Sequence, residues 1–173
     1  MRTIKVEGLV IGRRNLPNQD RIIIFFSQEL GKIILLGKNI KKITSKRLPH
    51  VQTGNYLQVS VEERHGIYYL QDTNLISAYS QIKKSLAKVN QLYLIFFILN
   101  KILPERQMEG SSFLLTRNFL KKLSQEPLNE TRLKNYLNEL LIGLGYLQEK
   151  INLSELLAKT EEIIAEKIPA FII

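Results

Sequence analysis

The sequence predicts an α+β fold, in which an N-terminal five-stranded β-barrel packs against a C-terminal all-helical domain. Residues 1–80 consist of short strand-like runs separated by turn residues. From residue 82 onward, apolar residues recur at the spacing of a helix face. Many short strands with short connections leave several edges, and a closed barrel removes those edges. We therefore expect a barrel over residues 1–80 and about four helices over residues 81–173.

Five stretches of the first half carry the strand pattern. We assign them to residues 4–12, 22–26, 33–36, 56–63 and 67–76. Gly8 and Gly12 mark close backbone approach or a bulge. Gly31 ends the turn between the second and third strands and is free to adopt a positive φ. The second strand is apolar on both faces, so we expect the helical domain to cover the face that points away from the barrel interior.

Four stretches of the second half have helical periodicity. We assign them to residues 82–103, 112–123, 133–144 and 153–164. Pro104 should end the first helix, and Gly145 is suited to cap the third. Asn152, followed three residues later by Glu155, resembles a capping box for the fourth. A polar connection at residues 105–110 should join the first helix to the second.

The charge of the chain is strongly positive and unevenly distributed. The formal net charge is +9 over 173 residues. Residues 1–80 carry 12 Lys and Arg against 6 Asp and Glu, whereas residues 81–173 carry 13 against 10. Residues 30–61 contain no acidic residue at all. This asymmetry favours nucleic acid, or an anionic membrane surface, as the partner of the first half.

The sequence gives little support to catalysis. It has no cysteine and no glycine-rich phosphate-binding motif. His50 and His65 lie beside turn residues without a spaced ligand or carboxylate partner. We therefore expect no enzyme activity, no metal and no cofactor. The longest apolar run, residues 92–99, is much shorter than the ~20 residues of a membrane span, and we expect a soluble cytoplasmic protein.

A basic loop after the third strand is the candidate binding site. Its cations, with those of the preceding loop and strand, could line one groove for a polyanion. The candidate DNA-binding cations are Arg13, Arg14, Arg21, Lys38, Lys41, Lys42, Lys46 and Arg47. Tyr68 and Tyr69 are neighbours on a strand, so one of them must face outward, where it could stack on a base or cover the contact with the helical domain.

Two other functions remain open at this point. The chain could be a protein–protein adaptor whose basic loop is incidental, in which case a partner would bind the helical half without sensitivity to salt. It could also bind anionic membranes. That third reading is weaker, because the basic residues fall in a barrel loop and not along one face of an amphipathic helix.

Residues 6–42, VEGLVIGRRNLPNQDRIIIFFSQELGKIILLGKNIKK, resemble the N-terminal barrel of the bacterial recombination mediator RecO. The features that carry the resemblance are Asp20 before an apolar strand, the pair Gly31-Lys32, and the basic loop that begins at Gly37-Lys38. The run at 74–80, the Leu-Pro-Glu at 103–105 and LIGLGY at 141–146 are also RecO-like. The resemblance covers nearly the whole chain and rests on the order and spacing of these pieces.

The resemblance implies an oligonucleotide/oligosaccharide-binding (OB) barrel followed by a helical domain. It also implies binding of single- and double-stranded DNA, annealing of complementary strands, and a location at the nucleoid. RecO acts with RecR to displace the single-stranded-DNA-binding protein. The helical domain of the family binds the acidic C-terminal tail of that protein, a role that the resemblance carries over to Arg132 and Lys134.

The sequence departs from the family at one place. Many members insert a cysteine-rich zinc module after the helix that ends in Leu-Gly-Tyr. Here Gln148 leads almost directly to the helix at 153–164, and there is no cysteine. We therefore expect a variant without the zinc module, and with it without any stabilising or binding role of that module.

Overall fold

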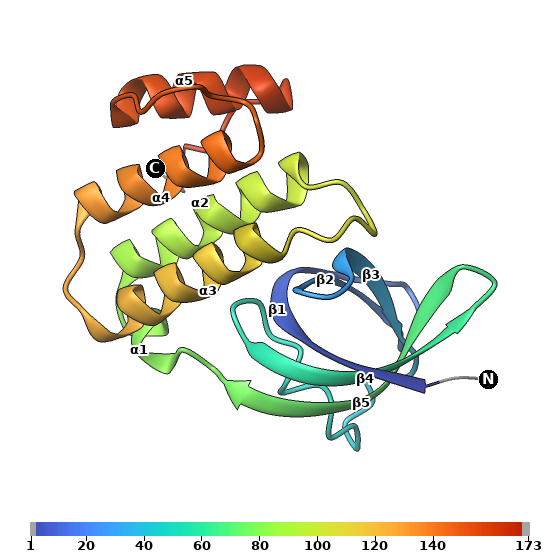
Figure 1. Ribbon diagram of the computed structural model, residues 1–173. Helices are drawn as coiled ribbons and strands as arrows, with labels where there is room; N and C mark the ends of the chain where they lie inside the picture. Colours follow the sequence, from blue (N-terminus) through green and yellow to red (C-terminus); the bar gives the residue numbers. More distant parts are fainter. Residues whose placement is uncertain (1–2, 171–173) are drawn as a thin grey trace. The chain divides into compact units, whose positions relative to one another are not determined.

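The computed structural model describes residues 3–170, which divide into two compact units. One unit runs to Ala78 and includes a second, separate segment, Leu103–Gly110. The other consists of Tyr79–Ile102 and the chain from Ser111 onward. Figure 1 shows the first unit as strands and the second as helices. Coverage of the second strand by the helical unit stays a prediction.

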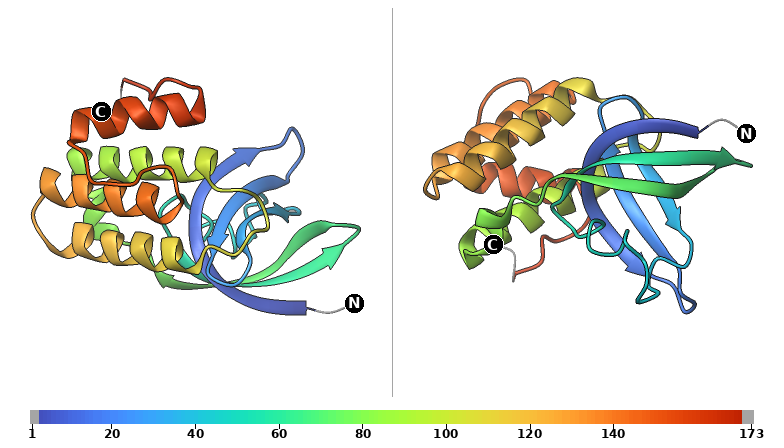
Figure 2. Two further views of the ribbon diagram at one scale, coloured as in Figure 1. Left: turned by 45° about the horizontal axis from the view of Figure 1, so that its top comes forward. Right: turned by 90° about the horizontal axis from the view of Figure 1, so that it is seen from below.

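The first unit is a closed five-stranded barrel, as the sequence predicts. Its strands are β1 (Thr3–Asn15), β2 (Arg21–Ser27), β3 (Gly31–Gly37), β4 (Tyr56–Arg64) and β5 (Ile67–Ser77). They close in the order β1-β2-β3-β5-β4. The β3–β5 pair is parallel and the other pairs are antiparallel. This arrangement is consistent with an OB fold, and Figure 2 shows the strands curling around one interior.

The barrel interior is filled by alternate residues of all five strands. Inward-facing side chains include Val10, Ile23, Phe25 and Leu35, all of them buried. The β1–β2 register shifts between Val10 and Gly12, which confirms the bulge predicted there. β1 also runs three residues further than predicted, through the arginines that follow Gly12. The strand thus continues past the bulge and carries Arg13 and Arg14 at its C-terminal end.

The segment Leu103–Gly110, which we call the strap, seals a gap in the barrel. β3 pairs with β5 at only two positions, so the start of β3 has an open edge. The strap forms a parallel bridge there between Lys32 and Glu105, and the Arg106 amide donates to the Lys32 carbonyl at 2.8 Å. The Arg106 guanidinium lies over the Tyr68 ring, 4.9 Å from its centroid, and pairs with Glu63 at 3.1 Å. The connection predicted as merely polar is therefore part of the barrel unit.

The second unit contains five helices among the described residues. They are α1 (Ser80–Lys83), α2 (Leu86–Ile102), α3 (Gly110–Gln125), α4 (Glu130–Gly143) and α5 (Leu153–Ile164). The single helix predicted from residue 82 is broken into α1 and α2, because Ser85 accepts a bond from the Lys88 amide at 3.5 Å and starts a new helix. Asn152 caps α5 as predicted, accepting from the Glu155 amide at 2.9 Å.

Buried polar side chains fix the packing of α3, α4 and the segment before α5. The Thr116 and Tyr136 hydroxyls are bonded at 2.8 Å, and burial raises the pKa of Tyr136, so the phenol stays neutral. Asn138, only 1% exposed, fastens the following segment to α4. Its side chain donates to the Ile151 carbonyl at 2.9 Å and accepts from the Ile151 amide at 2.8 Å.

Candidate nucleic-acid interface

The loop between β1 and β2 and the start of the loop between β3 and β4 lie side by side at one end of the barrel. The Asn39 amide donates to Asp20 Oδ1 at 2.7 Å, and the Lys41 amide donates to the Gln19 carbonyl at 3.0 Å. Lys41 Nζ donates to the Leu16 carbonyl at 2.6 Å. These bonds bring the basic residues of two separate stretches to the same end.

The β3–β4 loop is held rigidly against the barrel. Arg47 donates to the Leu70 carbonyl of β5 at 2.7 Å and to the Lys38 carbonyl at 2.8 Å. These bonds tie Lys38 and Arg47, the first and last cations of the loop, to each other and to β5. Ile40 and Val51 are buried in the barrel core and anchor the loop from below. The loop is thus an ordered surface whose cations have defined positions.

Among the described residues, the cations at this end, which we call the basic end, take part in none of the ion pairs. The basic end consists of Arg13, Arg14, Lys38, Lys41, Lys42, Lys46 and Arg47. The nearby Asp20 side chain accepts hydrogen bonds from the Asn39 amide and from the Asn18 side chain, and it forms no ion pair with a lysine of the described residues. The basic end therefore keeps an excess of positive charge even with the Asp20 carboxylate nearby.

Arg21 departs from the prediction that it is a surface contact. It is only 8% exposed, and its Nε donates to Asn15 Oδ1 at 2.9 Å. Its Nη1 is buried without an acceptor in the described part of the chain. Burial and the neighbouring Arg13 lower the pKa of Arg21. The reason is the pleat, since Arg21 lies on the same face of β2 as the core residue Ile23.

The two tyrosines of β5 face opposite ways, as predicted, and only one faces outward. Tyr68 is 8% exposed and belongs to the barrel core, so it is not available for stacking. Tyr69 is partly exposed on the outer face. Lys38 Nζ lies 5.0 Å from the centroid of its ring, and Arg64 Cζ lies 5.6 Å away. Tyr69 is therefore an aromatic surface bordered by cations, one of them from the basic end.

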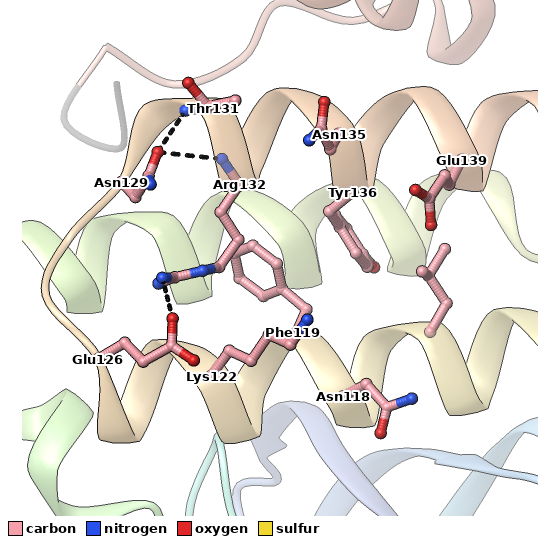
Figure 3. Close-up of a pocket in the computed structure, with 11 residues that line it drawn as sticks. Asn118, Phe119, Lys122, Glu126, Asn129, Thr131, Arg132, Asn135, Tyr136 and Glu139 are labelled. Carbon is pink, nitrogen blue, oxygen red and sulfur yellow. Dashed lines mark hydrogen bonds and ion pairs between the residues drawn. The ribbon is translucent and has the colours of Figure 1, made fainter.

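A second candidate site is a groove between α3 and α4, with a volume of about 320 Å³. Figure 3 shows Phe119 and Tyr136 on its floor, with ring centroids 4.7 Å apart. Lys122 and Arg132 supply positive charge, and Glu126 and Glu139 supply negative charge. The groove therefore combines an aromatic floor with a charged rim, which suits a short peptide.

Arg132 lines this groove, whereas Lys134 does not. The Arg132 guanidinium is paired with Glu126 and donates to the Pro127 carbonyl at 3.1 Å. Lys122 occupies the basic position opposite Arg132 in the groove, and sequence reasoning did not single it out. The available signal was the i, i+3 spacing of Phe119 and Lys122 on one face of α3.

Other kinds of site were searched for in the described residues. Residues 3–170 contain no group of three or more His, Asp or Glu side chains that could hold a metal ion. Within the same range, no helix is both long and apolar enough to cross a lipid bilayer.

Comparison with known proteins identifies relatives over most of the chain. Residues 1–79 match the family model described as Recombination protein O N terminal. The DNA repair protein RecO of Thermoanaerobacter sp. is 26% identical over 153 residues, which cover 88% of this chain and 62% of the relative. The protein of the same name from Caldanaerobacter subterraneus is 25% identical over 150 residues, covering 85% and 60%. The chain thus spans about three fifths of the length of these curated relatives.

Proposed function

We propose that the chain is a RecO-type protein, a non-catalytic DNA-binding mediator of recombinational repair, because residues 1–79 match the N-terminal family model and its relatives carry the name DNA repair protein RecO. It binds single- and double-stranded DNA and anneals complementary strands. With RecR it helps to displace the single-stranded-DNA-binding protein. The observation that supports the proposal is the basic end, whose seven cations take part in none of the ion pairs of the described residues.

The proposed mechanism is electrostatic and makes no covalent bond. Two complementary strands repel each other through their phosphates. The basic end neutralises phosphates on each strand, which lowers the repulsion and holds the bases close enough to pair. Contacts to the backbone carry no sequence information, so the protein should accept mixed sequences. Tyr69 adds a stacking surface beside Lys38, where an exposed base would gain about 1–3 kcal/mol.

A salt series with a labelled mixed-sequence single strand tests this proposal. With about five phosphate contacts, the log–log slope of the binding constant against salt should be about −3.5. Lys42→Glu/Lys46→Glu should weaken binding and make the slope shallower by about 1.4, because both side chains are exposed in the basic loop.

The matched control is Lys121→Glu/Lys150→Glu, which makes the same charge change at exposed positions of the helical unit. This control should keep the wild-type slope. A slope that shifts equally in both double variants would mean that net charge alone drives binding, and the basic end would lose its role. The same proteins should then be compared in an annealing assay with complementary strands.

The groove between α3 and α4 supports the second part of the proposal. We propose that it receives the acidic C-terminal tail of the single-stranded-DNA-binding protein. The aromatic pair Phe119 and Tyr136 would take the apolar end of the tail, and Lys122 and Arg132 its carboxylates. Arg132 already binds one carboxylate, that of Glu126, which illustrates the chemistry that the tail would use.

A fluorescent peptide with an acidic body and an apolar C-terminal residue tests the groove. Arg132→Ala should weaken its binding at least tenfold, because a charge-assisted pair contributes about 1.5–3 kcal/mol. Lys134→Ala is the matched control on the same helix, since Lys134 lies outside the groove. Equal losses in both variants would reject the groove as the peptide site.

A further inference from the structure

Ile43 is the most exposed large apolar residue in the described part of the chain. Its exposed fraction is 100%, and the next highest value there is 78%, for Leu86. It lies within the basic loop, directly after Lys42 and three residues before Lys46. Single exposed apolar residues are ordinary on protein surfaces. Three further features distinguish this one.

The first feature is the backbone. The Ser45 amide donates to the Lys42 carbonyl at 2.8 Å, which closes a four-residue turn with Ile43 in its first central position. Pro and polar residues are favoured in such turns, and a β-branched apolar residue has no local reason to be there. The turn therefore projects an apolar side chain into solvent without any benefit to the turn itself.

The second feature is the bracing on both sides of the turn. Ile40 is fully buried, and Lys41 Nζ is bonded to the Leu16 carbonyl at 2.6 Å. On the other side, Arg47 is bonded to the carbonyls of Lys38 and Leu70. A projecting residue on a braced loop loses little conformational entropy when it makes a contact, so it is preorganised for binding.

The third feature is the charge around it. Lys42 begins this turn and Lys46 directly follows it, and both are exposed. Residues 30–61 contain no acidic residue. A ligand that satisfies this surface must offer negative charge beside apolar surface. A single-stranded nucleic acid does so, because its phosphates alternate with bases whose faces are unstacked and open to contact.

We propose that Ile43 is an apolar probe that packs against bases of single-stranded nucleic acid while the neighbouring lysines hold the backbone. This inference rests on the proposed DNA binding and deepens it. It assigns part of the affinity to a contact that salt does not screen. In duplex DNA the base faces are stacked, so the contact is made only with single strands or at frayed ends.

The test compares Ile43→Ala with wild type on a labelled 20-nucleotide mixed-sequence strand across a salt series. Complete burial of an isoleucine side chain would raise a binding constant more than tenfold. Partial burial against a base therefore predicts that Ile43→Ala binds the strand about fivefold more weakly at every salt concentration. The log–log slope should stay at the wild-type value, because no charge is removed. Affinity for a duplex of the same length should change less than twofold.

A strand of the same length made of abasic sugar-phosphate units separates bases from backbone. Ile43→Ala and wild type should bind it equally. Ile76→Ala, which removes another exposed isoleucine of the barrel unit, is the control for the substitution and should bind both strands like wild type. Because Ile43 makes no buried contact, the thermal midpoint should be unchanged, so a loss of binding cannot be attributed to unfolding.

Unchanged affinity of Ile43→Ala for the base-containing strand would overturn the inference, as would an equal loss on the abasic strand. Loss of binding to vesicles with anionic lipid, without loss on the base-containing strand, would also overturn it and assign Ile43 to a membrane. The proposed function itself fails by a different result, which is wild-type protein that does not retain the mixed-sequence strand with a steep dependence on salt.

Discussion

Gly31, at the start of β3, has a positive φ of 66° and faces the strap. In Gly31→Ala the added Cβ would lie 1.8 Å from the Gln107 carbonyl oxygen, which is backbone and must move. The strained backbone alone costs about 1–2 kcal/mol, and the displaced strap adds to this cost. We expect a loss of about 3 kcal/mol or more in the free energy of unfolding, measured by urea titration.

Gly66→Ala is the control for that substitution. Gly66 also has a positive φ, of 77°, but an added Cβ would meet nothing within 4 Å. The free energy of unfolding of Gly66→Ala should fall only by the cost of the strained backbone, about 1–2 kcal/mol. Similar losses in the two variants would show that the contact between Gly31 and the strap does not matter for stability.

At the level of single residues, local pattern predicted some roles and missed others. The turn chemistry before β3 was sufficient to predict the positive φ of Gly31. The alternation of a strand indicated that Tyr68 and Tyr69 face opposite sides, but it does not say which one faces the core. Arg21 was missed because a basic residue beside a basic loop gives no sign that the pleat turns it inward.

At the level of elements, Asn138 on α4 stabilises the segment that connects α4 to α5. Asn138→Ala removes three hydrogen bonds, to the Lys134 carbonyl and to both backbone groups of Ile151. The backbone groups of the half-buried Ile151 lose their partner, so we expect a loss of about 2–3 kcal/mol in the free energy of unfolding. Hydrogen exchange of the Ile151 amide should accelerate more than that of amides within α4.

Asn135→Ala is a matched change on the same helix, because Asn135 is exposed. Its effect should stay within about 0.5 kcal/mol, as is usual for surface positions. If the Ile151 amide exchanges equally fast in both variants, Asn138 does not fasten the segment.

The elements themselves follow closely from periodicity and capping residues. The cap of α5 at Asn152 was predicted from the Asn-x-x-Glu spacing, and the break between α1 and α2 was missed because apolar residues continue in phase across it. The groove between α3 and α4 was beyond prediction. It depends on which faces of two helices meet, and a single sequence gives the faces without the pairing.

At the level of the whole molecule, two carboxylates link stability to pH, one in each unit. A hydrogen bond from Arg64 lowers the pKa of Glu62, and one from Lys167 lowers the pKa of Glu161. A carboxylate whose pKa is lower in the folded protein than its ordinary 4.5 stabilises the fold at pH values above 4.5. This stabilisation is lost as the pH falls through the pKa of the folded state. The free energy of unfolding, measured from pH 7 to about pH 3, should therefore decrease, and the decrease should begin near pH 5.

Glu62→Gln/Glu161→Gln should be less stable than wild type at pH 7, and the difference should shrink as the solution is acidified. Glu149→Gln, at an exposed position without an ion pair in the described part of the chain, should follow the wild-type curve. If the free energy of unfolding of the double variant depends on pH in the same way as that of wild type down to pH 3, the two ion pairs do not couple stability to pH.

The division into strands and helices, and the excess of positive charge in the first half, were visible in composition and pattern alone. The return of the chain from the end of α2 to the barrel was not. The strap contains Pro104, Glu105, Arg106 and Gln107, which read as a loop, and its place against β3 depends on contacts some 70 residues apart in sequence. Such long-range pairing leaves no periodic signal.

The strap has a consequence for dividing this protein into fragments. The polypeptide passes between its two units three times, after Ala78, after Ile102 and after Gly110. A fragment that stops at residue 79, where the family match ends, would lack the piece that closes the open edge beside Lys32. Bare strand edges recruit other chains, so that fragment should self-associate. A monomeric minimal barrel would need the eight strap residues grafted back through an artificial linker.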